Sequence, residues 1–115
     1  MKRFFDVDFM PGAVAFMESL DEKTREKIYF NIRKSQFIQD SEIFKKLNNQ
    51  IWEFKTLYNN MSYRLFSFWD DSEKQRTLVV ATHGILKKTQ KTPLKEIEKA
   101  EELRRQYMNS KPNKK

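Results

Sequence analysis

Apolar and polar positions alternate with helical spacing in the N-terminal part of the chain and with strand-like spacing further on. Between Ala13 and Leu20 the apolar residues recur at roughly helical intervals, and a second helix is expected from about Asp21 to Ser35. Before them, the β-branched and aromatic stretch 3–9 predicts a strand, which Pro11-Gly12 ends. Because only a short link separates the two helices, we expect them to lie antiparallel.

From residue 51 the pattern changes to strands. The runs 51–58, 62–69 and 77–83 are rich in aromatic and β-branched residues. Asn59-Asn60 is a turn signal, and so is 70–72, which is Asp-Asp-Ser. These three strands are expected to form an antiparallel meander.

A last helix is expected to begin after Thr92, a good N-cap, with Pro93 at the first helical position. Glu101 and Arg105 are expected to pair on its outer side. Its buried stripe is predicted to contain Ile97, Ala100, Leu103 or Arg104, and Tyr107. The element order predicts an α+β fold with two N-terminal helices packed on one face of an antiparallel sheet and a C-terminal helix. Residues 1–108 are interpreted as one domain and 109–115 as a basic, disordered tail.

The predicted hairpin places two cations opposite each other. If Asn59-Asn60 is a two-residue turn, Lys55 pairs with Arg64 on one face of the sheet. Like charges in this position are destabilising. An anionic ligand would resolve the conflict, and Glu53, on the same face, would serve as a screen or as an acid–base partner. A slip of one residue would remove the pair. The opposite face would carry Trp52, Phe54, Tyr63 and Leu65 as a core surface.

The charge of the chain is strongly positive and uneven. Its 115 residues carry a formal net charge of +7, with a pI of about 9.6. Residues 84–95 contain four lysines and no acid, whereas 96–102 contain four glutamates. A basic loop at the end of a sheet strand favours an anion, and nucleic acid is the most plausible large one. His83, the only histidine, stands where this loop begins and has either a site role or a purely structural one.

Several classes of protein are excluded or disfavoured. The chain has no cysteine and only two glycines, so disulfides, a thiol nucleophile, a cysteine-ligated metal and a glycine-rich phosphate loop are absent. One histidine makes a zinc site or a serine triad improbable. No apolar run has the length of a membrane span, and no signal core follows the basic N-terminus, which favours a cytoplasmic protein.

Phosphoryl transfer without a metal or cofactor remains as an economical chemistry. RNA supplies its own nucleophile, because its 2′-hydroxyl attacks the adjacent phosphate and a 5′-hydroxyl leaves. The protein has to align the groups, move protons and stabilise the added negative charge. Lysine acts as an acid or base only if neighbouring cations lower its pKa, and a cluster of Lys55, Arg64, Lys87 and Lys88 would do so.

At these residues the chain resembles the RelE/HigB-type toxins of bacterial toxin–antitoxin systems, in particular their phage-derived HigB-like branch. The similarity covers nearly the whole chain. It is most specific in Lys46-Leu47 followed by Ile51-Trp52-Glu53-Phe54-Lys55, in Tyr63-Arg64-Leu65-Phe66, and in the stretch from His83 to Pro93 with Glu96-Ile97 and Ala100 after it.

The resemblance implies a RelE-like fold and a ribosome-dependent endoribonuclease, an mRNA interferase that inhibits translation. It also implies a helix-turn-helix, HigA-like antitoxin as partner. Arg64 would bind the phosphate together with Lys55, which stands where many relatives have arginine. Lys87 and Lys88 would be the cations at the strand end. Further expected roles are proton transfer or lysine orientation for Glu53 or His83, and RNA binding for Lys46 and Lys91.

Two other functions stay open at this point. The first keeps the fold and makes the chain a ParE-like toxin that inhibits DNA gyrase without cutting RNA. The second makes it a non-catalytic nucleic-acid-binding protein whose basic face only grips phosphates. In that case Arg64→Ala or Lys55→Ala would weaken binding modestly and change its salt dependence.

Overall fold

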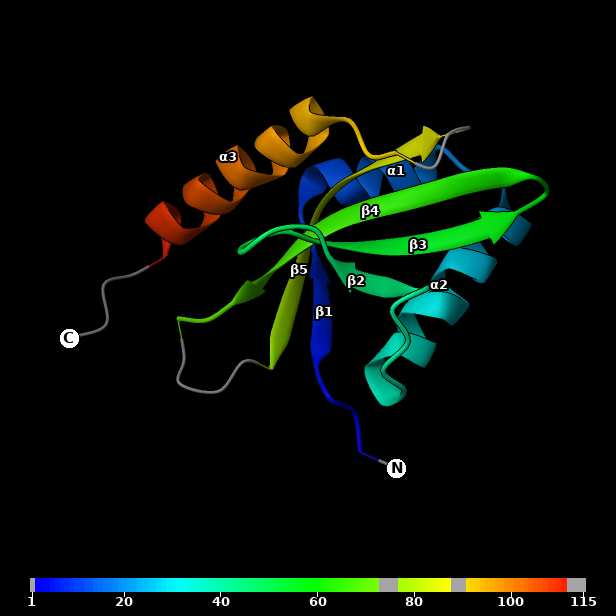
Figure 1. Ribbon diagram of the computed structural model, residues 1–115, viewed down its shortest axis with the longest axis horizontal. Coiled ribbons are helices and arrows are strands. Elements are labelled where there is room, and N and C mark those ends of the chain that lie inside the picture. The colour runs from blue at the N-terminus through cyan, green and yellow to red at the C-terminus, as the bar shows by residue number, and fades with distance from the viewer. Residues whose placement is uncertain (1, 73–76, 88–90, 112–115) are drawn as a thin grey trace.

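A computed structural model describes residues 2–72, 77–87 and 91–111 of the chain. These residues form a five-stranded sheet and three helices, and the helices pack on both of its faces (Figure 1). In chain order the elements are β1 (Asp6–Phe9), α1 (Pro11–Glu18), α2 (Glu22–Phe37), β2 (Phe44–Lys46), β3 (Trp52–Tyr58), β4 (Met61–Asp70), β5 (Leu78–Lys87) and α3 (Leu94–Ser110). None of the helices in the described ranges is long and apolar enough to cross a membrane.

The strand order is β1-β5-β4-β3-β2. Strands β3, β4 and β5 form the predicted antiparallel meander, and β2 adds to it antiparallel. Only β1 departs from this pattern within the described sheet, because it pairs parallel to β5 and makes the sheet mixed. The short β2 was not predicted, since two of its three residues are lysines, a composition typical of protected edge strands. Strand β5 also continues to Lys87, past the predicted end at His83.

The hairpin between β3 and β4 has the predicted register. Asn59 and Asn60 take φ angles of 53° and 61°, the left-handed pair of a tight type I′ turn. Lys55 therefore lies opposite Arg64, as predicted. The unusual charge pair is thus a real feature of one sheet face.

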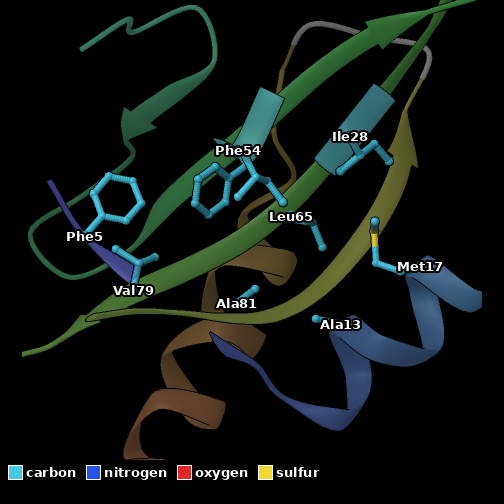
Figure 2. Packing of buried hydrophobic residues seen from close by; sticks show 9 residues of the cluster. Phe5, Ala13, Met17, Ile28, Phe54, Leu65, Val79 and Ala81 are labelled. Atoms are coloured by element: carbon cyan, nitrogen blue, oxygen red, sulfur yellow. The ribbon is translucent and has the colours of Figure 1, made fainter. Parts of the chain in front are cut away.

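Two apolar cores lie on the two faces of the sheet. Under α1 and α2, Phe54 and Leu65 of the predicted core surface are buried (Figure 2). Trp52 and Tyr63 are partly buried on the same face. This core contains Phe5, Ala13, Met17, Ile28, Ile32, Phe54, Leu65, Val79 and Ala81. The second, smaller core under α3 contains Ile51, Phe66, Phe68, Val80 and Ala100. Figure 1 shows the β3–β4 hairpin extending away from α3, so this helix covers only part of its face.

The ends of the helices differ in how well the sequence predicted them. Asp21 caps α2, because its side chain accepts a hydrogen bond from the Thr24 amide. The prediction that Thr92 caps α3 was wrong: the N-cap is Pro93, and it makes no side-chain cap hydrogen bond. The Thr92 hydroxyl is instead hydrogen-bonded to side chains of the sheet.

The C-terminal end of α3 is anchored to the end of β4. The buried Asp70 carboxylate accepts hydrogen bonds from Tyr107 Oη at 2.7 Å and from Lys111 Nζ at 2.8 Å. Helix α3 runs to Ser110, beyond the expected start of a disordered tail at 109, and residues 112–115 lie outside the described residues. Glu101 and Arg105 do not pair as predicted, because Glu101 accepts from Asn48 and Arg105 binds Glu102.

Candidate functional site

A β-bulge at Thr82 decides which side chains face α3. The register of β4 against β5 shifts between Phe66, which pairs with His83, and Ser67, which pairs with Ala81. Thr82 is the extra residue, and its hydroxyl donates to the Phe66 carbonyl at 3.2 Å. Because side chains alternate between faces along a strand, the bulge moves every later residue of β5 to the opposite face.

As a consequence, Lys87 shares the sheet face of Arg64. Downstream of the bulge, His83 pairs with Phe66, Ile85 with Arg64, and Lys87 with Ser62. Leu86 on the alternate face is largely exposed, while Lys87 is buried. The candidate site is therefore assembled across β3, β4 and β5.

A buried ion pair lies at the centre of this face. Arg64 Nη1 donates to Glu53 Oε1 at 2.9 Å and to Oε2 at 3.0 Å. The Glu53 side chain is 0 % exposed and that of Arg64 is 2 % exposed. The sequence left open whether the positive charge of the Lys55–Arg64 pair is neutralised by an external anion or by Glu53. For Arg64 in this structure it is Glu53.

Two hydroxyl groups also accept hydrogen bonds from the Arg64 guanidinium. Arg64 Nε donates to Ser62 Oγ at 2.9 Å, and Nη1 donates to Thr92 Oγ1 at 3.0 Å. Thr92 Oγ1 in turn donates to Glu53 Oε1 at 3.1 Å. The guanidinium plane is therefore held from several directions, with Nε and Nη1 both engaged by side chains of the protein.

Lys87 is the unusual cation of the site. It is only 7 % exposed, and its Nζ has no hydrogen-bond partner among the described residues. Burial lowers the pKa of Lys87, the nearby Arg64 guanidinium lowers it further, and Glu53 opposes this by raising it. A buried ammonium without a partner is costly, which is typical of a group that awaits a ligand or exchanges a proton.

The charges of this cluster do not balance. Arg64 and Lys87 are two cations, and among the residues that the structure describes Glu53 is the carboxylate beside them, which leaves one positive charge in excess. Lys55, half-buried and opposite Arg64, adds a further positive charge at the rim. The arrangement fits a single bound anion such as a phosphate.

His83 occupies a different part of the same face. Its Nε2 is 3.0 Å from Glu96 Oε1 on α3, its Nδ1 is 2.9 Å from Thr82 Oγ1, and its ring stacks on Phe66. Burial lowers the pKa of His83. These contacts tie β5 to the first turn of α3, which is the structural role that the sequence left open.

The remaining predicted residues are placed less centrally. Lys46 pairs with Trp52 and so belongs to the α1/α2 side of the sheet, whereas its neighbour Lys45 pairs with Glu53. Lys91 is exposed immediately before Thr92, next to the site. Lys88 lies outside the described residues.

Sequence reasoning missed Ser62 and Thr92 as members of the site. Ser62 carried no signal apart from its position two residues before Arg64 on the same face. Thr92 was assigned to helix capping, a role for which its residue type is equally suited. Among the residues that the structure describes, no three His, Asp or Glu side chains form a cluster that could hold a metal ion.

The fold defines the class of protein. A mutant of the Escherichia coli toxin RelE in the free state matches this chain with a TM-score of 0.59 at 16 % identity, over 89 % of this chain and 97 % of that one. The fold is therefore RelE-like, as predicted. No curated protein sequence matches the chain significantly.

The family is fixed by the sequence itself. The family model described as phage-derived protein Gp49-like (DUF891) matches residues 15–105, which is most of the chain, and the chain belongs to this family. Two parts of the predicted resemblance are therefore confirmed, the phage-derived family and the RelE-like fold.

Proposed function

We propose that this protein is the toxin of a toxin–antitoxin pair and that it cleaves mRNA on the translating ribosome. The observation that carries the proposal is the buried cluster of Arg64, Lys87 and Glu53, which among the described residues has one positive charge in excess and an ammonium without a hydrogen-bond partner. A site of this kind has the chemistry to bind a phosphate and to stabilise the further negative charge of a phosphorane-like transition state.

Each side chain has a distinct role in the proposed reaction. Arg64, oriented by Glu53 and Ser62, holds the scissile phosphate, and Lys55 assists from the rim. The RNA 2′-oxygen forms the new bond to phosphorus and gives up its proton to water, and the bond to the 5′-oxygen breaks as that oxygen takes a proton from Lys87 Nζ. The products are a 2′,3′-cyclic phosphate and a 5′-hydroxyl. No separate nucleophile is needed from the protein.

Lys87 is the proposed proton-transfer group. The pKa of Lys87 is lowered and so lies closer to neutral pH than that of an ordinary lysine, which is what general acid–base catalysis by a lysine requires. Glu53 is fully enclosed and bound to Arg64, so it acts by orienting the guanidinium rather than by meeting RNA. His83 is occupied by Glu96 and Thr82 and is left out of the proposed chemistry.

The protein surface supports the choice of partners. The exposed Lys91 and the net charge of +7 favour a polyanion such as mRNA or ribosomal RNA. The family relationship supports an antitoxin as the second partner, and a helix-turn-helix, HigA-like protein is the form that we propose.

The test is cleavage of a reporter mRNA in a translating extract, mapped by primer extension, with wild-type protein and with Lys87→Met. Lys34→Met is the matched control, because Lys34 is exposed at the end of α2 on the other side of the sheet. We expect new 5′ ends within the reading frame for the wild type and Lys34→Met but not for Lys87→Met. These ends should accept phosphate from polynucleotide kinase directly, because they carry 5′-hydroxyls, and they should disappear when translation is blocked.

Other outcomes identify the alternatives. Intact mRNA and unimpaired translation at high protein concentration contradict the nuclease proposal and favour inhibition of DNA gyrase. That activity would be detected as DNA damage in cells that express the protein. RNA that binds to the protein but shows no new 5′ ends identifies a non-catalytic nucleic-acid-binding protein. Equal cleavage by Lys87→Met and the wild type contradicts the role given to Lys87.

A further inference from the structure

Thr92 makes contacts that its place in the sequence does not explain. It directly precedes the N-cap of α3, Pro93, and α3 begins without any side-chain cap hydrogen bond. From the sequence, the Thr92 hydroxyl would be expected to cap the helix, a role that threonine commonly has. Instead it is directed to the sheet, where it binds Arg64 and Glu53.

The geometry of this hydroxyl links the two charged groups. Thr92 Oγ1 accepts from Arg64 Nη1 at 3.0 Å and donates its only proton to Glu53 Oε1 at 3.1 Å. Since Nη1 also donates to both Glu53 oxygens, the three side chains form a closed ring of hydrogen bonds. Such a ring limits the rotation of the guanidinium about its Nε–Cζ bond, because rotation would break several hydrogen bonds at once.

We propose that Thr92 is a positioning residue of the candidate site: its hydroxyl fixes the plane of the Arg64 guanidinium against Glu53, so that the plane is set before a phosphate binds. The effect on cleavage rests on the proposed nuclease function, whereas the effect on Arg64 does not. Thr92 follows the exposed Lys91 and precedes α3, so its hydroxyl also links the start of this helix to Arg64 of the sheet.

The side-chain order of Arg64 is the first measurement. In the 15N-labelled full-length protein, the rate at which the two Nη atoms exchange by rotation is measured by NMR, and the Arg64 signals are assigned by their loss in Arg64→Lys. We expect rotation to be roughly tenfold faster in Thr92→Val, which keeps the shape but lacks the hydroxyl. Thr92→Ser should rotate as slowly as the wild type. Thr92→Ala repeats the test without a second branch methyl and excludes a steric effect.

Cleavage kinetics on the ribosome are the second measurement. We expect kcat to fall roughly 10- to 100-fold in Thr92→Val, with little change in KM, because a misoriented guanidinium loses contacts made in the transition state. Thr92→Ser should restore kcat. Thr77→Val is the matched control, since Thr77 is exposed and precedes the other end of β5.

The outcomes separate the two proposals. Fast rotation of Arg64 in Thr92→Val and Thr92→Ala, together with rescue by serine, supports the positioning role. Unchanged rotation in both variants overturns it, whatever the cleavage rate. If the wild type cleaves no RNA while the Arg64 guanidinium still rotates faster in Thr92→Val, the nuclease proposal fails and the positioning of Arg64 by Thr92 stands.

Discussion

Replacing Lys87 by methionine should make the folded protein more stable. The Lys87 ammonium is 7 % exposed and lacks a hydrogen-bond partner among the described residues, and a second cation, Arg64, lies nearby. Methionine has a similar length and a flexible apolar side chain that fills irregular space. The change therefore removes a desolvated charge without opening a large cavity.

The expected gain can be bounded. Replacing buried charges with apolar residues of similar volume is often neutral or stabilising by about 1–4 kcal/mol, and Glu53 already returns part of the cost of Lys87 by attraction. We therefore expect the free energy of unfolding to rise by about 1–2 kcal/mol at pH 7. For a domain of this size that is a rise in Tm of roughly 4–8 °C.

The gain should depend on pH in a defined direction. The pKa of Lys87 is lower in the folded protein than its ordinary value of 10.5, so the unfolded chain binds more protons between the two values. The free energy of unfolding of the wild type therefore rises with pH in that window. The advantage of Lys87→Met should be fully present below the lowered pKa of Lys87 and shrink as the pH rises from that pKa towards 10.5.

Urea unfolding followed by tryptophan fluorescence measures these differences. Lys34→Met is the control, because it removes an exposed lysine and should change the free energy of unfolding by less than about 0.5 kcal/mol. A loss of stability in Lys87→Met, or a gain that is the same at pH 7 and pH 10, would refute the view that Lys87 is a charge held at a cost. Such a result would place the ammonium in contact with water or with an anionic group.

Three other substitutions test the frame around the site. Asp70→Asn should lower the free energy of unfolding by about 1–3 kcal/mol, because Lys111 and Tyr107 lose a carboxylate acceptor. Asp70 has a pKa far below its ordinary 3.8, so this contribution is present above pH 3.8 and lost below it, as an acid titration of both proteins would show. Gly84→Ala should cost about 1–3 kcal/mol, since its Cβ would approach the Phe16 ring to 2.3 Å, and a second change, Phe16→Leu, should recover part of this in thermal melts. His83, with its pKa lowered from 6.5, should make the wild type lose stability below pH 6.5, a loss that His83→Asn reduces.

Local rules were sufficient for the hairpin that carries Arg64. Two asparagines tolerate positive φ angles, a two-residue turn fixes the register, and the register fixes which side chains are opposite. The whole inference from Asn59-Asn60 to the Lys55–Arg64 pair requires no contact distant in sequence. It was therefore accessible from the chain alone.

The rest of the site depends on contacts that local rules do not describe. The bulge at Thr82 is set by how β5 packs between β4 and the helices, and no turn residue marks it. Without it, alternation from Val80 would have placed His83 and Lys87 on the α1/α2 side. The parallel pairing of β1 with β5 has the same origin, because it joins residues about seventy positions apart. Thr92 shows the limit most clearly, since its sequence context satisfied a helix-capping rule that the folded protein does not use.

The sequence predicted a repulsion between Lys55 and Arg64. In the structure the charge of Arg64 is neutralised, but an excess positive charge remains elsewhere in the site. Glu53 neutralises Arg64 inside the protein, and Ser62 and Thr92 hold the guanidinium in place. The excess charge then remains on Lys87, for which the described residues provide no acceptor. A chain selected for stability alone would have an apolar residue there, because removing this ammonium is expected to stabilise the fold. The unfilled need for a negative charge at Lys87 is therefore the strongest physical reason to place a phosphate between Lys87 and the oriented face of Arg64.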